Sequence, residues 1–201
     1  DRIFSNISKE SISFLDTQYR MSNEIGNIVS SLFYNGRLKN GRGFSDYHSI
    51  EWIDYQTNKK YPNKPICDGG ILRNEIEAKI IVDIIINRFN KQNNKFIAII
   101  TPYIQQKKYI HELLSKAECF LNFEVNTIDA YQGREADIVF ISFVRNNGPG
   151  KFFSDLRRLN VAISRAKDKV IFVGMIDYLK RHLYELLNCI DSKNIIKYEE
   201  K

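Results

Sequence analysis

The sequence predicts an α/β domain of three layers (α/β/α), in which helices cover both faces of a mainly parallel sheet. Residues 96–100 form a continuous apolar run of strand length, and residues 138–144 form a second run that only Ser142 interrupts. Such runs are typical of parallel strands covered on both faces. Strand-like segments also alternate with helical patterns of about 10–15 residues, which indicates crossover connections. With 201 residues and 43% hydrophobic content, the chain can bury a real core, and we expect one domain over residues 1–201.

The first part of the chain is expected to begin with a short strand at residues 11–16. Ser22 is a favoured N-cap for the helix that follows, and Gly36 suits the end of that helix. Residues 41–72 contain several Gly and Pro residues, so we expect an irregular insertion or loop region there. Within it, residues 50–55 have the composition of a strand.

The rest of the chain alternates more regularly. Asn74 followed by Glu77 resembles a helix-capping arrangement, and apolar residues at helical spacing come after it. Further strands are expected at residues 96–100, 123–128, 138–144 and 170–173, and further helices after residue 103, at 156–166 and at 178–190.

The composition favours some partners over others. The net charge is +6 and the sequence pI is near 9.1, which favours a polyanion, nucleic acid ahead of an anionic membrane; the alternative is a mildly basic surface without a specific partner. The three cysteines and three histidines are scattered, so no metal site is predicted. No apolar run approaches the roughly 18 residues of a membrane span. We expect an intracellular monomer, either cytoplasmic or nuclear. Because the sequence begins at Asp1 without an initiator Met, we also expect it to be excised from a longer chain.

Three polar motifs stand near the expected ends of strands, at residues 18–20, 101–103 and 127–135. In open parallel sheets, ligands bind beyond the carboxyl ends of the strands. We therefore expect the three motifs to gather at that one edge of the sheet.

Arg20 and Arg165 are the candidate phosphate-binding residues, since a guanidinium offers bidentate donors and stays protonated. For Arg20 the alternative is a surface salt bridge between domains. For Arg165, expected near the end of a helix, the alternative is a charge that complements the helix dipole. Gly133 suits a turn with positive φ or a close approach of backbone to phosphate, although a single glycine is common in turns.

Thr101, Tyr103 and Thr127 offer hydroxyl groups near strand ends, and Lys107 and Lys108 follow closely. Hydroxyls, a helix N-terminus and lysines together can bind a nucleic-acid backbone independently of its sequence. The alternative is an ordinary strand exit followed by a solvated helix start.

The motifs, in this order, resemble those of the second RecA-like domain of superfamily 1 helicases, in the branch of the nonsense-mediated-decay helicase and senataxin. The resemblance is carried by residues 15–21 (Leu-Asp-Thr-Gln-Tyr-Arg-Met), 99–103 (Ile-Ile-Thr-Pro-Tyr), 127–137 and 157–166, and residues 33–36, 74 and 77 agree with it. It covers nearly the whole chain and is weakest over 41–72. It implies a RecA-like fold related to the P-loop NTPases.

The resemblance also implies two sets of site residues. Arg20 and Arg165 would be catalytic and would contact the γ-phosphate of ATP. Tyr19 would lie against the adenine, and Gln132, Gly133 and Glu135 would border the nucleotide, with Glu135 towards the ribose. The nucleic-acid path would be lined by Thr101, Pro102, Tyr103, Thr127 and Asn160.

The chain departs from the family in one respect: it lacks the phosphate-binding loop Gly-x-x-x-x-Gly-Lys-Ser/Thr and the acidic magnesium-binding motif of the first domain. ATP with Mg²⁺ is therefore expected to bind between this chain and a first RecA-like domain that holds the metal. Together they would form an ATP-dependent RNA or RNA/DNA helicase that closes on ATP, and the resemblance implies stepping from 5′ to 3′. The alternative is a non-catalytic module that only binds nucleic acid or a protein partner.

Overall fold

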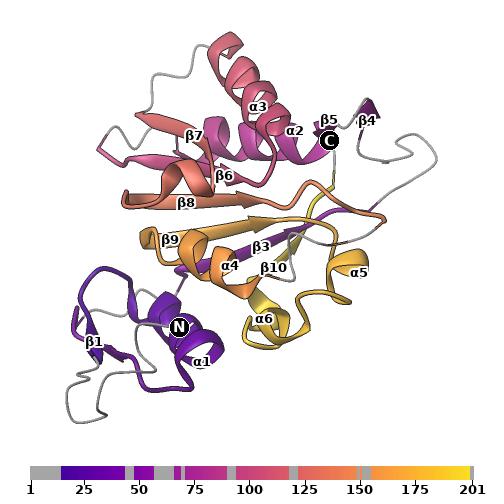
Figure 1. Ribbon diagram of the computed structural model, residues 1–201. Coiled ribbons are helices and arrows are strands. Elements are labelled where there is room, and N and C mark those ends of the chain that lie inside the picture. Colours follow the sequence, from indigo (N-terminus) through magenta and orange to yellow (C-terminus); the bar gives the residue numbers. More distant parts are fainter. Residues whose placement is uncertain are drawn as a thin grey trace, which may run out of the picture.

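A six-stranded parallel sheet forms the middle layer of the protein (Figure 1). The computed structural model describes residues 15–43, 48–56, 66–68, 71–89, 94–117, 122–148, 150 and 155–199. In spatial order the strands are β10 (Ile195–Lys197), β3 (Ile50–Asp54), β9 (Ala166–Val173), β8 (Ala136–Ser142), β6 (Ile97–Thr101) and β7 (Phe123–Thr127). Every neighbouring pair among them is parallel.

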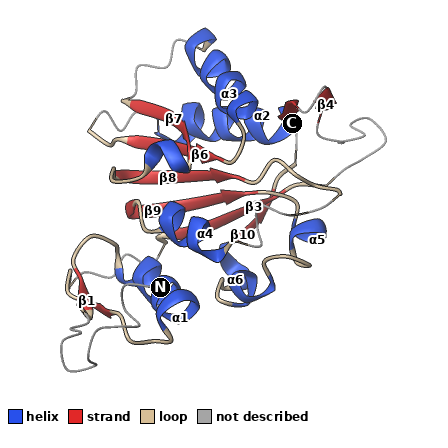
Figure 2. Ribbon diagram, viewed as in Figure 1, coloured by secondary structure: helices blue, strands red, loops and turns tan. Residues whose placement is uncertain are grey.

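Helices cover both faces of the sheet (Figure 2). On one face lie α1 (Asn23–Tyr34), α4 (Leu156–Ile163), α5 (Ile176–Leu179) and α6 (Tyr184–Asn188); on the other lie α2 (Glu75–Ile84), a π-helical turn (Ile85–Phe89) and α3 (Ile104–Lys116). Because successive strand residues point to opposite faces, Ala98 and Ile100 pack on the α1 side while Ile97 and Ile99 pack on the α2 side. The predicted three-layer α/β/α fold is confirmed.

Two small ribbons lie beside the main sheet. β1 (Thr17–Gln18) pairs in parallel with β2 (Lys39–Asn40), and β4 (Ile66–Asp68) pairs antiparallel with β5 (Ile71–Arg73). The strand predicted at residues 11–16 falls mostly outside the described residues, and β1, just after it, belongs to a ribbon and not to the main sheet. The described turns also include 3₁₀ segments at Asp129–Tyr131 and Ser192–Asn194.

The capping predictions are partly confirmed. The Asn74 side chain accepts hydrogen bonds from the backbone N–H groups of Ile76 and Glu77 and so caps α2. Ser22 occupies the N-cap position of α1, but its side chain makes no capping hydrogen bond. That helix ends at Asn35 (φ 52°) and Gly36 (φ 74°), both in the left-handed region.

Trp52 of β3 fills the centre of the core on the α1 side. Its ring stacks on Phe143 and Phe172, with centroids 5.3 and 5.2 Å away, and its Nε1 donates to the Gly174 carbonyl at 2.8 Å. β3 confirms the strand predicted at residues 50–55 and is an inner strand of the sheet, between β10 and β9, although it falls within residues 41–72, which were otherwise predicted to be irregular.

Two predicted helix boundaries were wrong. Residues 156–166 do not form one helix: α4 ends at Ile163, and β9 begins at Ala166 rather than at Val170. Ala166 is paired with Ala136 of β8, whose N–H donates to the Arg165 carbonyl, so ladder pairing overrides the helical pattern. The single helix predicted at 178–190 is divided into α5 and α6.

Candidate functional site

The prediction that the three polar motifs gather at one edge of the sheet was wrong. Residues 101–103 and Thr127 lie at the carboxyl ends of β6 and β7, whereas Glu135 and Arg165 lie just before β8 and β9, at their amino ends. Because β7 and β8 are parallel, residues 128–135 have to return the chain from one edge to the other. We call these places the carboxyl edge and the amino edge.

Charged side chains from three segments meet at the amino edge. Glu135 accepts from Arg20 Nε at 2.8 Å and pairs with Lys167 Nζ at 2.7 Å. Arg20 Nη1 also donates to the Ser164 carbonyl at 3.2 Å, next to Arg165. We call Arg20, Glu135, Arg165 and Lys167 the cationic cluster. Its hydrogen bonds from Lys167 and Arg20 lower the pKa of Glu135, so the carboxylate is ionised at neutral pH.

Arg165 is held by backbone and hydroxyl oxygens. Its Nε donates to the Val161 carbonyl at 3.0 Å, Nη1 to the Arg134 carbonyl at 3.1 Å and Nη2 to Ser164 Oγ at 3.3 Å. Burial, followed by the charge of Arg20, lowers its pKa, though a guanidinium remains protonated. Within the described residues it has no ion pair with a carboxylate. Three cations around one carboxylate give this edge an excess of positive charge.

An aromatic ring and a glycine turn lie beside the cluster. Tyr19 is 72% exposed, and its ring lies against Gly41, where an added Cβ would stand 2.3 Å from the ring. Gly133 has φ +85° with nothing within 4 Å of an added Cβ, and Gln132 beside it is exposed. A flat exposed ring, an open glycine turn and surplus cations match the base and the phosphates of a nucleotide.

Buried Tyr131 anchors this turn from below. Its ring is fully buried in the core on the α1 side, and its hydroxyl donates to the Glu135 carbonyl at 3.2 Å. Burial raises the pKa of Tyr131 to about 12, so the hydroxyl keeps its proton and remains a donor. Neither Tyr131 nor Lys167 was predicted as a site residue from the sequence, although Lys167 follows Arg165 by two positions.

The carboxyl edge carries four of the five predicted nucleic-acid residues, in a different setting. Thr101 is fully buried, and its hydroxyl has no hydrogen-bond partner among the described residues. Pro102, Tyr103 and Thr127 are half-buried. Tyr103 Oη accepts from Arg145 Nε at 2.8 Å, and Arg145 Cζ lies 5.8 Å from the centre of the Tyr103 ring. Arg145 directly follows the strand predicted at residues 138–144. That position at the end of a strand could have identified it as a candidate site residue.

A strained turn precedes Arg145. Val144 has φ +68°, and the turn is closed by Arg145 N–H donating to the Phe143 carbonyl at 2.8 Å. A β-branched residue in this region is a true outlier and costs about 1–3 kcal/mol. Two buried side chains hold it: Glu77 accepts from Val144 N–H at 2.7 Å, and Asn74 Nδ2 donates to the Val144 carbonyl at 2.8 Å.

Glu77 is the centre of a buried hydrogen-bond network below that turn. It has no exposed surface, and it also accepts from Ser142 Oγ at 2.7 Å and from Tyr55 Oη at 3.1 Å. Burial raises the pKa of Glu77 to about 7, against the opposing effect of these hydrogen bonds. The network joins α2, β3 and β8 just below the carboxyl edge.

Asn160 is not brought to the carboxyl edge. It lies on α4, where its Nδ2 donates to Tyr34 Oη of α1 at 3.3 Å. The contact joins two helices on the same face of the sheet. Among the predicted nucleic-acid residues it is therefore set apart from Thr101, Tyr103 and Thr127.

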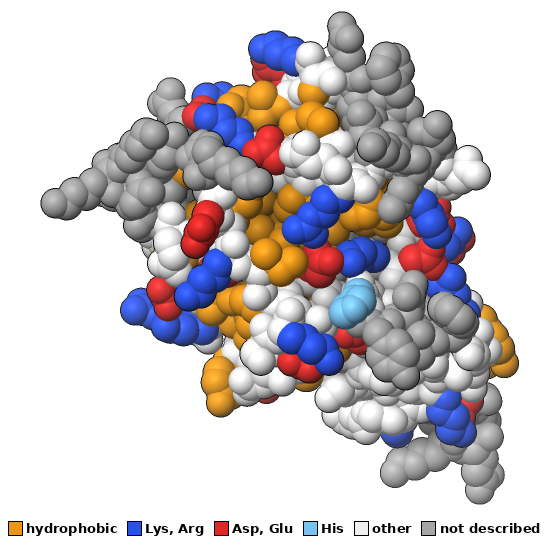
Figure 3. Space-filling view, turned by 180° about the vertical axis from the view of Figure 1, so that it is seen from behind, with side chains coloured by type: hydrophobic (Ala, Val, Ile, Leu, Met, Phe, Trp, Pro, Cys, Tyr) orange, Lys and Arg blue, Asp and Glu red, His pale blue; other side chains and the backbone are white. Residues whose placement is uncertain are grey.

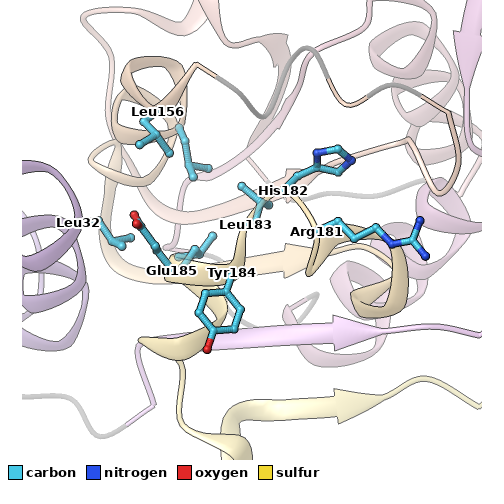
Figure 4. Close-up of a pocket in the computed structure, with 9 residues that line it drawn as sticks. Leu32, Leu156, Arg181, His182, Leu183, Tyr184 and Glu185 are labelled. Atoms are coloured by element: carbon cyan, nitrogen blue, oxygen red, sulfur yellow. The ribbon is translucent and has the colours of Figure 1, made fainter.

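Other surfaces offer less. A pocket of about 380 Å³ opens between α1, α4 and α6, with leucines such as Leu32 and Leu156 pointing into it (Figure 4). No residue of the cationic cluster lines this pocket. The face opposite to Figure 1 mixes acidic and basic side chains around a hydrophobic centre (Figure 3). In the described residues, no group of three His, Cys, Asp or Glu side chains could hold a metal, and no helix has both the length and the hydropathy to cross a membrane.

Comparison with known proteins gives consistent matches. A family model described as an AAA domain matches residues 1–177. The chain is 36% identical to the DNA replication ATP-dependent helicase/nuclease DNA2 of Homo sapiens, over 94% of this chain and 21% of that protein. It is 34% identical to regulator of nonsense transcripts 1 of Caenorhabditis elegans, over 90% and 18%. The chain thus spans about a fifth of the length of these relatives.

One solved structure shares the fold. It is the C-terminal domain of a possible DNA helicase from Lactobacillus plantarum, with a TM-score of 0.53, 15% identity and coverage of 90% of this chain and 99% of that one. At this identity the likeness concerns the α/β fold alone.

Proposed function

The chain belongs to the AAA domain family as the second RecA-like domain of a superfamily 1 helicase, and on that basis we propose that it is the C-terminal motor domain of an ATP-dependent helicase. In this proposal the amino edge supplies half of an ATP cleft, and the carboxyl edge supplies part of the track for a single nucleic-acid strand. The other half of the cleft comes from a first RecA-like domain.

The observation that carries the proposal is the cationic cluster. Arg20 and Lys167 come from segments that are far apart in the sequence, yet both pair with Glu135, and Arg20 also donates to the Ser164 carbonyl beside Arg165. Arg165 has only backbone and hydroxyl oxygens as described partners, so its charge is available to an incoming phosphate. Preorganised cations of this kind stabilise the charge that develops in phosphoryl transfer.

Each residue at the amino edge then has a role towards ATP. Arg20 and Arg165 bind the γ-phosphate, and Tyr19 offers its ring to the adenine. Gln132 and Gly133 border the nucleotide, and Glu135 accepts from the ribose hydroxyls. Magnesium, held by the first domain, would neutralise phosphate charge there. Since Arg20 and Arg165 reach the γ-phosphate only when the domains are closed, loss of that phosphate lets the domains separate.

The carboxyl edge supports a nucleic-acid track. Tyr103 is half-buried there, and α3 begins directly after it with Lys107 in its first turn and no acidic residue. Such a helix start attracts phosphates, and an aromatic ring tolerates any base. The fully buried Thr101 hydroxyl would have to become exposed before it could contact the strand.

The decisive test joins the chain to a first RecA-like domain that carries the phosphate-binding loop. We expect ATP hydrolysis that single-stranded nucleic acid stimulates, and Arg165→Ala should lower kcat by about 10³-fold. The matched control is Arg88→Ala, since Arg88 pairs with Glu51 elsewhere on the surface. A fully active Arg165→Ala protein would contradict the proposal. Nucleic-acid binding without any ATP hydrolysis in the fusion would favour the non-catalytic module instead.

The same fusion can separate RNA from DNA. Relatives named for DNA replication and for nonsense transcripts match this chain to a similar degree. Stimulation of ATP hydrolysis by a homopolymer of uridine should be compared with stimulation by one of deoxythymidine. Contacts made to phosphates alone predict similar stimulation by both.

A further inference from the structure

Arg145 has no part in the function proposed above, yet its surroundings are those of a binding residue. Its guanidinium lies at the Tyr103 ring and its Nε is bonded to the Tyr103 hydroxyl. Among the described residues, no salt bridge includes Arg145, and neither of its Nη atoms has a hydrogen-bond partner. The side chain is half-buried, so its charge is fixed in place but not neutralised.

The backbone before Arg145 is held in an unfavourable conformation by buried hydrogen bonds. Val144 is a β-branched residue at φ +68°, a conformation that persists only where the surroundings impose it. Both polar groups of Val144 are bonded to fully or nearly fully buried side chains, the N–H to Glu77 and the carbonyl to Asn74. Because this strained turn is held from two sides, it orients the Arg145 side chain towards Tyr103 at the carboxyl edge.

We propose that Arg145 binds a backbone phosphate of a single nucleic-acid strand at the carboxyl edge, with the Tyr103 ring as its support. The inference rests on the proposed function, which places a strand at this edge. A guanidinium can give a phosphate two parallel hydrogen bonds, and its bond to Tyr103 restricts the side chain in advance, so less freedom is lost on binding. Asn74 and Glu77 are positioning residues that act through the Val144 turn.

The experiment measures binding of fluorescent homopolymers of deoxythymidine and uridine to the chain by anisotropy, between about 50 and 200 mM salt. Arg145→Ala should weaken both complexes about tenfold, as expected for loss of one charged contact. It should also lower the slope of log Kd against log salt by about 0.7, the value for one phosphate of a single strand. Arg145→Lys should keep that slope while it weakens binding, because lysine retains the charge but not the fork.

Arg88→Ala is the matched control, with unchanged affinity and slope. Unchanged binding by Arg145→Ala would overturn the inference and leave the proposed function standing. An equal loss in Arg88→Ala would overturn it too, because the effect would then be one of general charge. A loss confined to the uridine polymer would point to a ribose contact and overturn the phosphate assignment.

Two further outcomes concern the ligand itself. If inorganic phosphate displaced the fluorescent polymer as effectively as unlabelled polymer does at the same phosphate concentration, the site would be one that binds free anions. That result would overturn the inference. A wild-type chain that binds neither polymer would overturn it together with the nucleic-acid part of the proposed function, whereas ATP hydrolysis by the fused protein would remain a separate measurement.

Discussion

Glu135 at the amino edge and Glu77 below the carboxyl edge each accept hydrogen bonds from several partners, but in opposite environments. The Glu135 side chain is 43% exposed and its partners are cations; Glu77 has no exposed surface and its partners are a hydroxyl, a phenol and a backbone N–H. Correspondingly, the pKa of Glu135 is lowered and that of Glu77 is raised. Exposed ion pairs therefore hold the side chains at the amino edge, whereas a buried hydrogen-bond network holds the turn at the carboxyl edge.

The difference explains how one small domain can hold both a changeable and a fixed surface. Exposed ion pairs contribute about 0–1 kcal/mol, so the cations around Glu135 can exchange it for another anion at little cost. A buried network is expensive to break once formed, so the Val144 turn keeps its geometry. An edge that repeatedly binds and releases a polyphosphate suits the first arrangement, and an edge that aims fixed contacts at a strand suits the second.

The largest stability effect is expected for Glu77→Ala. Removal of the carboxylate leaves Val144 N–H, Ser142 Oγ and Tyr55 Oη without this buried partner, and we expect a loss of roughly 3–5 kcal/mol. Urea denaturation of the two proteins measures it. The control is Glu112→Ala, whose carboxylate is exposed and pairs with Lys116. A loss below about 1 kcal/mol for Glu77→Ala would remove the contrast between the edges.

The pH dependence of stability should come next in size. The folded chain keeps the Glu77 proton up to about pH 7, whereas the unfolded chain releases it near 4.5. Between these values the folded state binds more protons, so the free energy of unfolding should fall as pH rises, by roughly 3 kcal/mol at most. Glu77→Gln should flatten this slope in denaturation experiments across the window. If the free energy of unfolding changed with pH equally in the wild type and in Glu77→Gln, the pH dependence would come from other groups.

The two N-caps give a smaller, paired prediction. Asn74→Ala removes bonds to Ile76 N–H, Glu77 N–H and the Val144 carbonyl, and we expect it to cost about 2 kcal/mol. Ser22→Ala should be near neutral, since the Ser22 hydroxyl is buried and has no hydrogen-bond partner in the part of the chain that the structure describes. Thermal melting of both variants tests the pair, and equal losses would show that cap position alone, and not the buried network, sets the cost.

The smallest effect is expected for Glu135→Gln. The substitution weakens the pairs with Arg20 and Lys167, which are exposed, so stability should fall by less than about 1 kcal/mol. The loss should shrink further in high salt, because exposed charges are screened. Denaturation at low and high salt measures both. A loss as large as that of Glu77→Ala would mean that the amino edge is as rigid as the carboxyl edge.

Many of the strands, helices and caps could be predicted from local sequence patterns. The apolar run at 96–100 and the capping pair Asn74 and Glu77 specified β6 and the start of α2, because burial and capping depend on neighbouring residues. The helix predicted at 156–166 failed because pairing between Ala136 and Ala166 is a long-range contact. Grouping Thr127 with Glu135 failed for a related reason: the return of residues 128–135 across the sheet depends on which strands are neighbours.

The order of the motifs was thus enough to identify the family and to single out Arg20, Glu135 and Arg165. Only the tertiary structure decided that these residues face the amino edge, that Lys167 joins them, and that Arg145 is aimed at Tyr103 by a strained turn. The physical reason is that composition and periodicity record the local preferences of the backbone, whereas side chains far apart in the sequence are brought together by strand order and packing. For the same reason, no local pattern distinguished exposed Glu135 from Glu77, fully buried beneath the carboxyl edge.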